Sequence, residues 1–203
     1  MKLPALALAS TLLLAGTAAL AASATVGQPA PAFSAFDAHG KAVSLADFKD
    51  RTVVLEWVNP GCPYVRKHYD SANMQSTQRS AADKGVVWLS VNSTHPGHVD
   101  YRKPAAMAAW MQAQGATATA LMDSEGSIGR AYGARTTPHL YVVDAKGTLV
   151  YAGGIDDKPS ANPADTKTAR NHVNAALADL LAGRPVAQPV TRAYGCSVKY
   201  ADG

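Results

Sequence analysis

Cysteine is scarce in this chain of 203 residues, which contains only Cys62 and Cys196. The two are far apart in the sequence, so metal or redox motifs that need two neighbouring cysteines are excluded. Lysine and arginine are scattered and the formal net charge is only +4, which gives no support to nucleic acid binding. Internal repeats, a phosphate-binding glycine loop and a Ser/His/Asp arrangement are also missing. The chemistry of the chain therefore depends on what surrounds each single cysteine.

Long apolar segments are confined to the start of the chain. Residues 3–20 are rich in alanine and leucine and follow Lys2, and the small residues at 19–21 and 22–24 match cleavage patterns. Polar residues interrupt the run and no charges follow it, so residues 1–24 are predicted to be a secretory signal peptide rather than a membrane anchor. We therefore expect a periplasmic protein, in an oxidising compartment, with no stable membrane insertion after cleavage.

The remaining chain has the length of one domain, which we place at residues 25–186, followed by a C-terminal tail at 187–203 that carries Cys196. Strands are predicted at 33–36, 42–45, 52–58, 86–92, 118–122, 139–143 and 148–152, and helices at 63–84 with a bend near 70–73, at 101–114 with a cap near Asp100, at 128–132 and at 164–181. This order predicts an α/β fold whose mixed central sheet is flanked by helices on both faces.

One corner of the predicted fold surrounds Cys62. The apolar strand at 52–58 runs into the turn formers at 59–61, and Pro63 is suited to the first position of a helix. Cys62 thus lies at a helix N-terminus, where unpaired N–H groups and the helix dipole stabilise a thiolate. The alternative is a small buried apolar residue. A strand-to-helix corner followed by basic residues is more typical of a reactive thiol.

This corner resembles the active site of the thioredoxin superfamily. The sequence Cys-Pro-Tyr-Val at 62–65 is similar to the Cys-Pro-Tyr-Cys of glutaredoxin-like proteins, with Val65 in place of the second cysteine. Glu56 lies six residues before Cys62, where thioredoxins carry a buried acid that moves protons. The sequence Thr-Pro at 137–138, followed by a strand, resembles the cis-proline loop that faces the active cysteine.

Further sequence segments extend the resemblance over residues 26–200. Residues 59–69, 133–138, 153–159 and 194–200 resemble a branch of bacterial thioredoxin-fold redoxins described as peroxiredoxin-like. The resemblance implies a thioredoxin-like fold and an enzyme that uses Cys62 either in peroxide reduction or in thiol-disulfide exchange. It also implies that the residues around the cysteine bind substrate, namely Pro63, Tyr64, Thr137 and Pro138.

The pattern departs from peroxiredoxins in two places. Peroxiredoxins usually carry threonine or serine three residues before the reactive cysteine and proline four residues further back, whereas this chain has Asn59 and Leu55. The departure counts against strong peroxidase activity, although Asn59 can donate a hydrogen bond to a peroxide oxygen. For disulfide exchange, a buried Glu56 with a raised pKa would assist proton transfer.

The sequence leaves three roles open for Cys196. It is a resolving thiol that attacks oxidised Cys62, a partner in a permanent structural disulfide with Cys62, or an unpaired cysteine that bonds to another protein. We favour the resolving role, because position 65 lacks a second cysteine. The expected partners are then a peroxide or protein disulfide and an external thiol reductant, with no cofactor.

Two other classes of function remain as alternatives. A thioredoxin-fold copper chaperone could bind copper through Cys62, His68 and His139, but its paired cysteines are missing, so we expect no metal. A redox-silent binding module would keep a permanent bond between Cys62 and Cys196.

Overall fold

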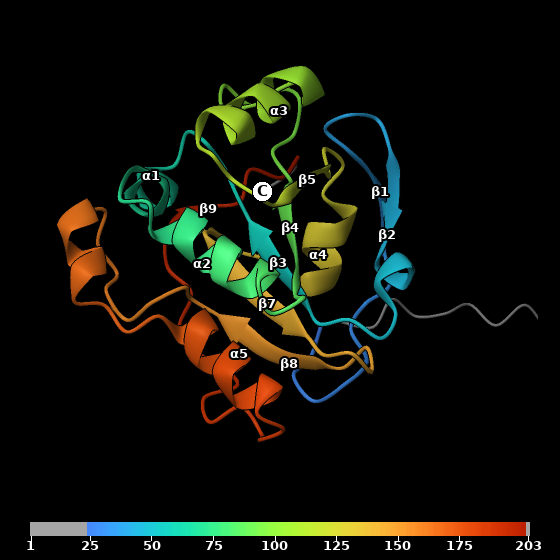
Figure 1. Ribbon diagram of the computed structural model, residues 1–203. Helices are drawn as coiled ribbons and strands as arrows, with labels where there is room; N and C mark the ends of the chain where they lie inside the picture. Colours follow the sequence, from blue (N-terminus) through green and yellow to red (C-terminus); the bar gives the residue numbers. More distant parts are fainter. Residues whose placement is uncertain (1–23, 202–203) are drawn as a thin grey trace, which may run out of the picture.

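The computed structural model describes residues 24–201 (Figure 1). The predicted signal peptide lies outside these residues, apart from Ala24. The strands are β1 (Ser34–Asp37), β2 (Ala42–Ser44), β3 (Val53–Trp57), β4 (Val87–Asn92), β5 (Thr119–Met122), β6 (Thr136–Thr137), β7 (His139–Val143), β8 (Leu149–Gly153) and β9 (Cys196–Ser197). The helices are α1 (Pro63–Asp70), α2 (Asn73–Ala82), α3 (Pro104–Ala113), α4 (Ser127–Tyr132) and α5 (His172–Leu181), with 3₁₀ turns η1 (Leu45–Phe48) and η2 (Pro163–Lys167).

The core of the fold is a sheet of seven strands in the order β2-β1-β5-β4-β3-β7-β8. Strand β4 is parallel to both β3 and β5, whereas β7 runs antiparallel to β3 and β8, and β1 runs antiparallel to β2 and β5. The sheet is therefore mixed, as predicted. Strand β3 lies between β4 and β7, and all five of its residues are buried, which agrees with its apolar sequence.

Alternate residues of β3, together with Val58, which follows it, point into two cores on opposite faces of the sheet. Val54 and Val58 belong to the core formed with α1, α2, α3 and α5, and Val53, Leu55 and Trp57 belong to the core formed with α4. Figure 1 shows α2 and α5 crossing the same face of the sheet. This alternation follows from the period of two in a strand, and it places Glu56 on the face of α1 and α2.

Three helix predictions differ from the structure. The helix predicted at 63–84 is broken into α1 and α2 near the predicted bend, because Ala72 adopts a left-handed conformation with φ of 58°. The helix predicted at 101–114 begins only at Pro104, after the extended residue Lys103. The helix predicted at 164–181 is the turn η2 followed by α5, whose first turn is capped when the Asn171 side chain accepts from the Asn174 N–H.

The C-terminal tail forms a second, unpredicted sheet. Its strand β9 pairs antiparallel with the two-residue strand β6, just before Pro138. Within residues 24–201, no helix has the length and apolar character needed to cross a membrane. The tail is thus packed on the domain, and it reaches the same edge as the Cys62 corner.

Candidate active site

The turn after β3 presents Cys62 at the start of α1. The Asn59 side-chain oxygen accepts a hydrogen bond from the Gly61 N–H at 2.8 Å, and the Asn59 carbonyl accepts one from the Cys62 N–H at 3.0 Å. Cys62 is the N-cap residue and Pro63 is the first residue of the helix, as predicted. The Cys62 side chain makes no capping hydrogen bond, so its sulfur lies at the positive end of the helix without bonding to the N–H groups there.

The sulfur of Cys62 lies between the proline loop and the tail. It is 3.1 Å from the carbonyl oxygen of Thr137 and 2.7 Å from Cys196 Sγ, and both cysteines are free. The Thr137–Pro138 peptide bond is cis, as the resemblance implied. Only 1% of Cys62 is exposed, and Cys196 of the tail lies against its sulfur. The structure therefore brings together Cys62, Cys196, Thr137 and Pro138, which are distant in sequence.

The tail approaches this closely because residue 195 is glycine. Gly195 has a φ of +135°, and a Cβ there would overlap the carbonyl oxygen of Thr137. Cys196 is then the register partner of Thr137, and the Val198 N–H donates to the Arg135 carbonyl at 3.0 Å. The glycine before the tail cysteine is a sequence signal for this contact that our predictions did not use.

The two sulfurs differ in their surroundings. Burial, then the hydrogen bond and charge of Cys62, and also the charge of Asp100, raise the pKa of Cys196 to about 12, although Lys199 acts to lower it. The thiol of Cys196 therefore keeps its proton near neutral pH. Of the pair, Cys62 is the sulfur placed at a helix N-terminus, where negative charge is stabilised.

Glu56 is buried, as the resemblance to thioredoxins implied. It is fully buried and accepts hydrogen bonds from Tyr69, Gln78, Trp88 and Ser90 at 2.8 to 3.2 Å. Burial raises its pKa above 4.5, and this effect outweighs the four hydrogen bonds that favour the charged form. Cys62 is not among its hydrogen-bond donors, so any proton exchange between the two passes through an intermediate group.

Asp100 is a site residue that the sequence interpretation missed. We predicted a helix cap near Asp100, and this was wrong, because α3 starts later with Lys103 as its N-cap. Instead, Asp100 Oδ2 accepts a hydrogen bond from Asn59 Nδ2 at 3.0 Å, and its carboxylate packs against Gly61. No sequence pattern links these residues, since the contact arises only when the loop after β4 folds over the turn.

The predicted substrate-binding residues fall into two groups. Pro63 is exposed and Tyr64 is half-buried, with its ring packed edge-on against Tyr194 at a centroid distance of 5.9 Å. Thr137 and Pro138 are buried under the tail. Any substrate that reaches the proline loop must therefore share that edge with β9 or displace it.

The two histidines considered as copper ligands have other partners. His68 is fully buried and bonded to Asn73 and Tyr194, whereas His139 contacts Tyr141 and the Arg135 N–H. Burial lowers the pKa of each histidine to about 4. Within residues 24–201, no three His, Cys, Asp or Glu side chains gather closely enough to hold a metal ion.

Solved structures define the class of protein. A hypothetical protein from Sinorhizobium meliloti 1021 is 26% identical with a TM-score of 0.76, covering 89% of this chain and 97% of that one. An uncharacterized conserved protein from Geobacillus kaustophilus is 27% identical with a TM-score of 0.78, covering 88% and 94%. The thioredoxin domain of a thiol-disulfide oxidoreductase from Bacteroides vulgatus is 26% identical with a TM-score of 0.51, covering 64% and 89%. The thioredoxin-like fold is confirmed.

Sequence comparison narrows this class to a family. The model of the AhpC/TSA family matches residues 26–152, which is more than half of the chain. The chain therefore belongs to the AhpC/TSA family of thioredoxin-fold redoxins, and the predicted class of thiol oxidoreductase holds at that level. A Mycobacterium tuberculosis protein named provisionally as a peroxiredoxin is 29% identical over 137 residues, covering 66% of this chain and 79% of that protein.

Proposed function

We propose that Cys62 attacks a small oxidant, with a peroxide as the leading substrate class, and that Cys196 resolves the oxidised product. The observation that carries the proposal is the 2.7 Å distance between the sulfurs of Cys62 and Cys196. A disulfide bond requires about 2.05 Å between sulfurs, so a small movement closes it. Cys62 is the attacking residue because it lies at the N-terminus of α1, whereas the pKa of Cys196 is raised to about 12.

The proposed cycle has three steps. The Cys62 thiolate attacks one oxygen of a peroxide, the O–O bond breaks, and the departing alkoxide or hydroxide takes up a proton, which leaves Cys62 as a sulfenic acid. The Cys196 sulfur then attacks the Cys62 sulfur, and the displaced hydroxide leaves as water with the Cys196 proton. An external thiol reductant finally donates two electrons, so that the disulfide opens and the reductant becomes a disulfide.

The surroundings of Cys62 support a small substrate. The sulfur is almost completely covered, and β9 already pairs with β6, the strand that a bound peptide would otherwise approach. A peroxide needs only a narrow path to the sulfur, whereas a folded protein must displace the tail. In this scheme Asn59 shapes the turn that presents Cys62, and burial raises the pKa of Glu56, which favours its protonated form.

Thiol-disulfide exchange is the second candidate. The cis-proline loop beside Cys62 favours it, as does the similarity to the thioredoxin domain of the Bacteroides vulgatus thiol-disulfide oxidoreductase. Here a substrate disulfide would be attacked by Cys62 and the mixed disulfide released by Cys196. This reaction requires β9 to leave β6, with Pro63 and Tyr64 then forming the rim of the peptide site. With the predicted signal peptide, either reaction takes place in the periplasm.

A peptide mass map under non-reducing conditions tests the proposal. The reduced protein without its predicted leader receives one equivalent of hydrogen peroxide, and free thiols are alkylated at intervals. We expect rapid loss of the Cys62 thiol, followed by a peptide in which Cys62 is linked to Cys196. Cys196→Ser should accumulate sulfenic acid at Cys62, and Cys62→Ser should leave the peroxide unreacted.

Other outcomes separate the alternatives. If Cys62 remains alkylatable with peroxide but reacts readily with a small disulfide, thiol-disulfide exchange replaces peroxide reduction as the function. If the cysteines of the purified protein are already linked and resist mild reductant, the bond is structural, and the redox-silent binding module is correct. Full peroxide consumption by Cys62→Ser would refute the proposed peroxide reduction, and an unchanged rate of disulfide exchange in Cys62→Ser would refute the second candidate.

A further inference from the structure

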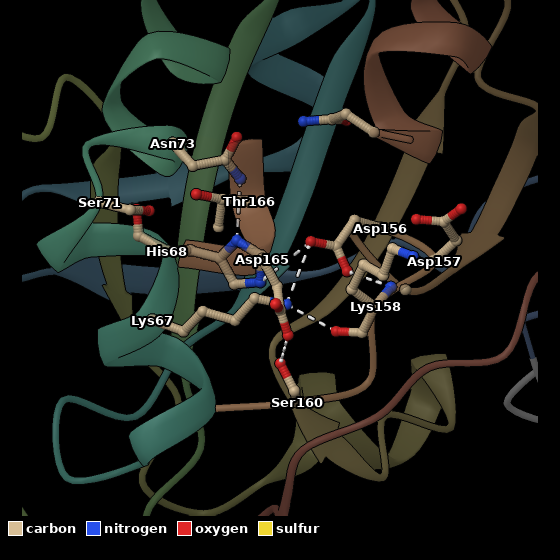
Figure 2. Close-up of polar contacts among 12 residues, drawn as sticks. Lys67, His68, Ser71, Asn73, Asp156, Asp157, Lys158, Ser160, Asp165 and Thr166 are labelled. Carbon is tan, nitrogen blue, oxygen red and sulfur yellow. Dashed lines mark hydrogen bonds and ion pairs between the residues drawn. The ribbon is translucent and has the colours of Figure 1, made fainter. Parts of the chain in front are cut away.

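A buried polar cluster lies between α1, the loop after β8 and the tail. Lys67, His68 and Asp156 are each at most 2% exposed, and Tyr194 is 8% exposed. Figure 2 shows Lys67 and His68 on α1 facing Asp156. None of these side chains takes part in the proposed chemistry. A lysine and a carboxylate are rarely buried together unless every donor is satisfied, because burying charges is costly. We therefore infer that this arrangement has a specific role.

The hydrogen bonds of the cluster meet at the Tyr194 hydroxyl. Lys67 Nζ donates to Asp156 Oδ2 at 3.3 Å, to the Lys158 carbonyl at 2.6 Å and to Tyr194 OH at 3.1 Å, which uses all three of its protons. Tyr194 in turn donates to Asp156 Oδ1. The hydroxyl therefore links both members of the ion pair.

His68 completes the set of partners around Tyr194. Burial lowers the pKa of His68 to about 4, so the ring is neutral near pH 7. Its Nδ1 lies 2.8 Å from the amide nitrogen of Asn73, which can only donate, so the ring proton belongs on Nε2. Nε2–H then donates to Tyr194 OH at 3.2 Å. The hydroxyl accepts two hydrogen bonds and donates one.

Tyr194 connects this buried cluster to the two cysteines. Tyr194 precedes Cys196 by two residues, and Lys67 follows Cys62 by five residues on α1, so one helix carries the reactive sulfur and holds the tail. Gly195, between the anchor and Cys196, contacts Thr137 closely. A tail fixed at Tyr194 has little freedom to move Cys196 away from Cys62.

We propose that Tyr194 is a positioning residue for the resolving step, held by Lys67, His68 and Asp156. The inference rests on the proposed function. Its consequence is that Cys196 stays beside Cys62 when the sulfurs are not bonded. An oriented intramolecular thiol has a high effective concentration. The sulfenic acid at Cys62 is therefore captured before a second peroxide oxidises it to sulfinic acid.

Tyr194→Phe tests the proposal, because it removes the hydroxyl and keeps the ring that packs on Tyr64. Tyr132→Phe is the matched control, since it removes a buried hydroxyl that donates to the Pro31 carbonyl at 2.8 Å on the other face of the sheet. Rapid-quench alkylation after peroxide addition measures two rates, loss of the Cys62 thiol and formation of the disulfide. We expect the second rate to fall by about tenfold or more in Tyr194→Phe alone.

The rate at which the Cys62 thiol is lost should stay close to that of the unchanged protein in both variants. Excess peroxide should produce sulfinic acid at Cys62 only in Tyr194→Phe. Disulfide formation at the normal rate in Tyr194→Phe would overturn the proposal. Should Tyr194→Phe fail to fold, His68→Gln, which leaves the Lys67–Asp156 pair intact, should show a smaller slowing in the same direction. An unchanged rate in a folded His68→Gln would then overturn it.

Diamide separates this proposal from the proposed function. It joins two neighbouring thiols directly, taking up their two electrons and two protons to become a hydrazine, and no sulfenic acid forms. If the unchanged protein does not react with peroxide, the proposed function fails, yet Tyr194→Phe should still close the disulfide with diamide more slowly than Tyr132→Phe. Equal closure rates with diamide would refute the positioning role of Tyr194.

Discussion

Cys196 is the register partner of Thr137, and the carbonyl oxygen of Thr137 contacts the sulfur of Cys62. One residue of the proline loop is thus shared by the two cysteines. Because β9 pairs with β6, Cys196 near the end of the sequence lies beside Cys62, far earlier in the chain. This explains how a chain without a Cys-x-x-Cys motif can still hold two thiols within bonding reach.

The first prediction concerns the glycine that permits this pairing. Gly195→Ala should push the tail off the proline loop, because a Cβ there meets the Thr137 carbonyl and the φ of +135° is strained for alanine. Strain of about 1–3 kcal/mol would shift the equilibrium between the docked and the released tail by roughly 5- to 150-fold toward the released tail. The measurement is the rate of disulfide formation after oxidation.

Gly147→Ala is the matched control for that change. Gly147 also has a positive φ, of +82°, but an added Cβ meets no atom within 4 Å. Both variants therefore pay a conformational penalty, and only Gly195→Ala blocks the tail. Equal rates of disulfide formation in the two variants would show that the β6–β9 pairing does not position Cys196.

The second prediction concerns the pH dependence that Glu56 confers. Burial raises the pKa of Glu56 in the folded protein above its ordinary value of 4.5. Between pH 4.5 and the raised pKa, the folded state therefore binds more protons than the unfolded state. Stability from this group is complete below pH 4.5 and is lost as the pH rises through the folded pKa, at up to about 1.4 kcal/mol per pH unit. Urea unfolding from pH 4 upward should show this loss in the unchanged protein.

Glu56→Gln provides the comparison, because glutamine cannot titrate. Its oxygen satisfies fewer of the four donors around Glu56, so the variant should be less stable at low pH. The gap between the two proteins should then narrow as the pH rises. Unfolding free energies that stay parallel across this range would mean that Glu56 does not carry a raised pKa.

The local part of the site could be predicted from the sequence, and the long-range part could not. The strand before Cys62, the turn and the helix start at Pro63 follow from neighbouring residues, whereas the buried position of Glu56 was implied by the resemblance to thioredoxins. The contact of Asn59 with Asp100 and the pairing of Cys196 with Thr137 join distant positions. Their register is set by loop packing, for which one sequence carries no periodic signal.

The same reason explains the errors in the helices. Residues 164–167 favour a helix locally, but the side chain of Asn171 caps a new first turn and α5 starts only at His172. Residues 101–103 are polar enough to begin a helix, yet Pro104 disfavours helical geometry at the residue before it. Capping and proline restrictions therefore override propensity at these boundaries.

The third prediction concerns acid stability. Burial lowers the pKa of His68 from 6.5 to about 4, so the folded state binds fewer protons than the unfolded state between these values. Stability from this histidine is complete above pH 6.5 and is lost as the pH falls toward 4, by on the order of 2–3 kcal/mol. His68→Gln should remove this part of the acid sensitivity, measured by urea unfolding at pH 7 and pH 4.5. His39→Gln, at an exposed turn, should leave it unchanged.

The last prediction concerns Asp100, whose negative charge contributes to the raised pKa of Cys196. Asp100→Asn removes the charge and keeps an oxygen that can accept from Asn59 Nδ2, so the turn before Cys62 should persist. The pKa of Cys196 should fall, and the pH profile of disulfide formation should shift to lower pH, because resolution uses the Cys196 thiolate. The shift should be modest, since burial and Cys62 dominate.

Stopped-flow oxidation at a series of pH values measures this profile in the unchanged protein, in Asp100→Asn and in Asp83→Asn. Asp83 is an exposed carboxylate at the end of α2, so its loss changes the net charge equally without altering the site. A shift in Asp100→Asn alone would place the carboxylate in the electrostatics of the resolving step. The same shift in both variants would reflect net charge, and Asp100 would then serve only to order the turn at Asn59.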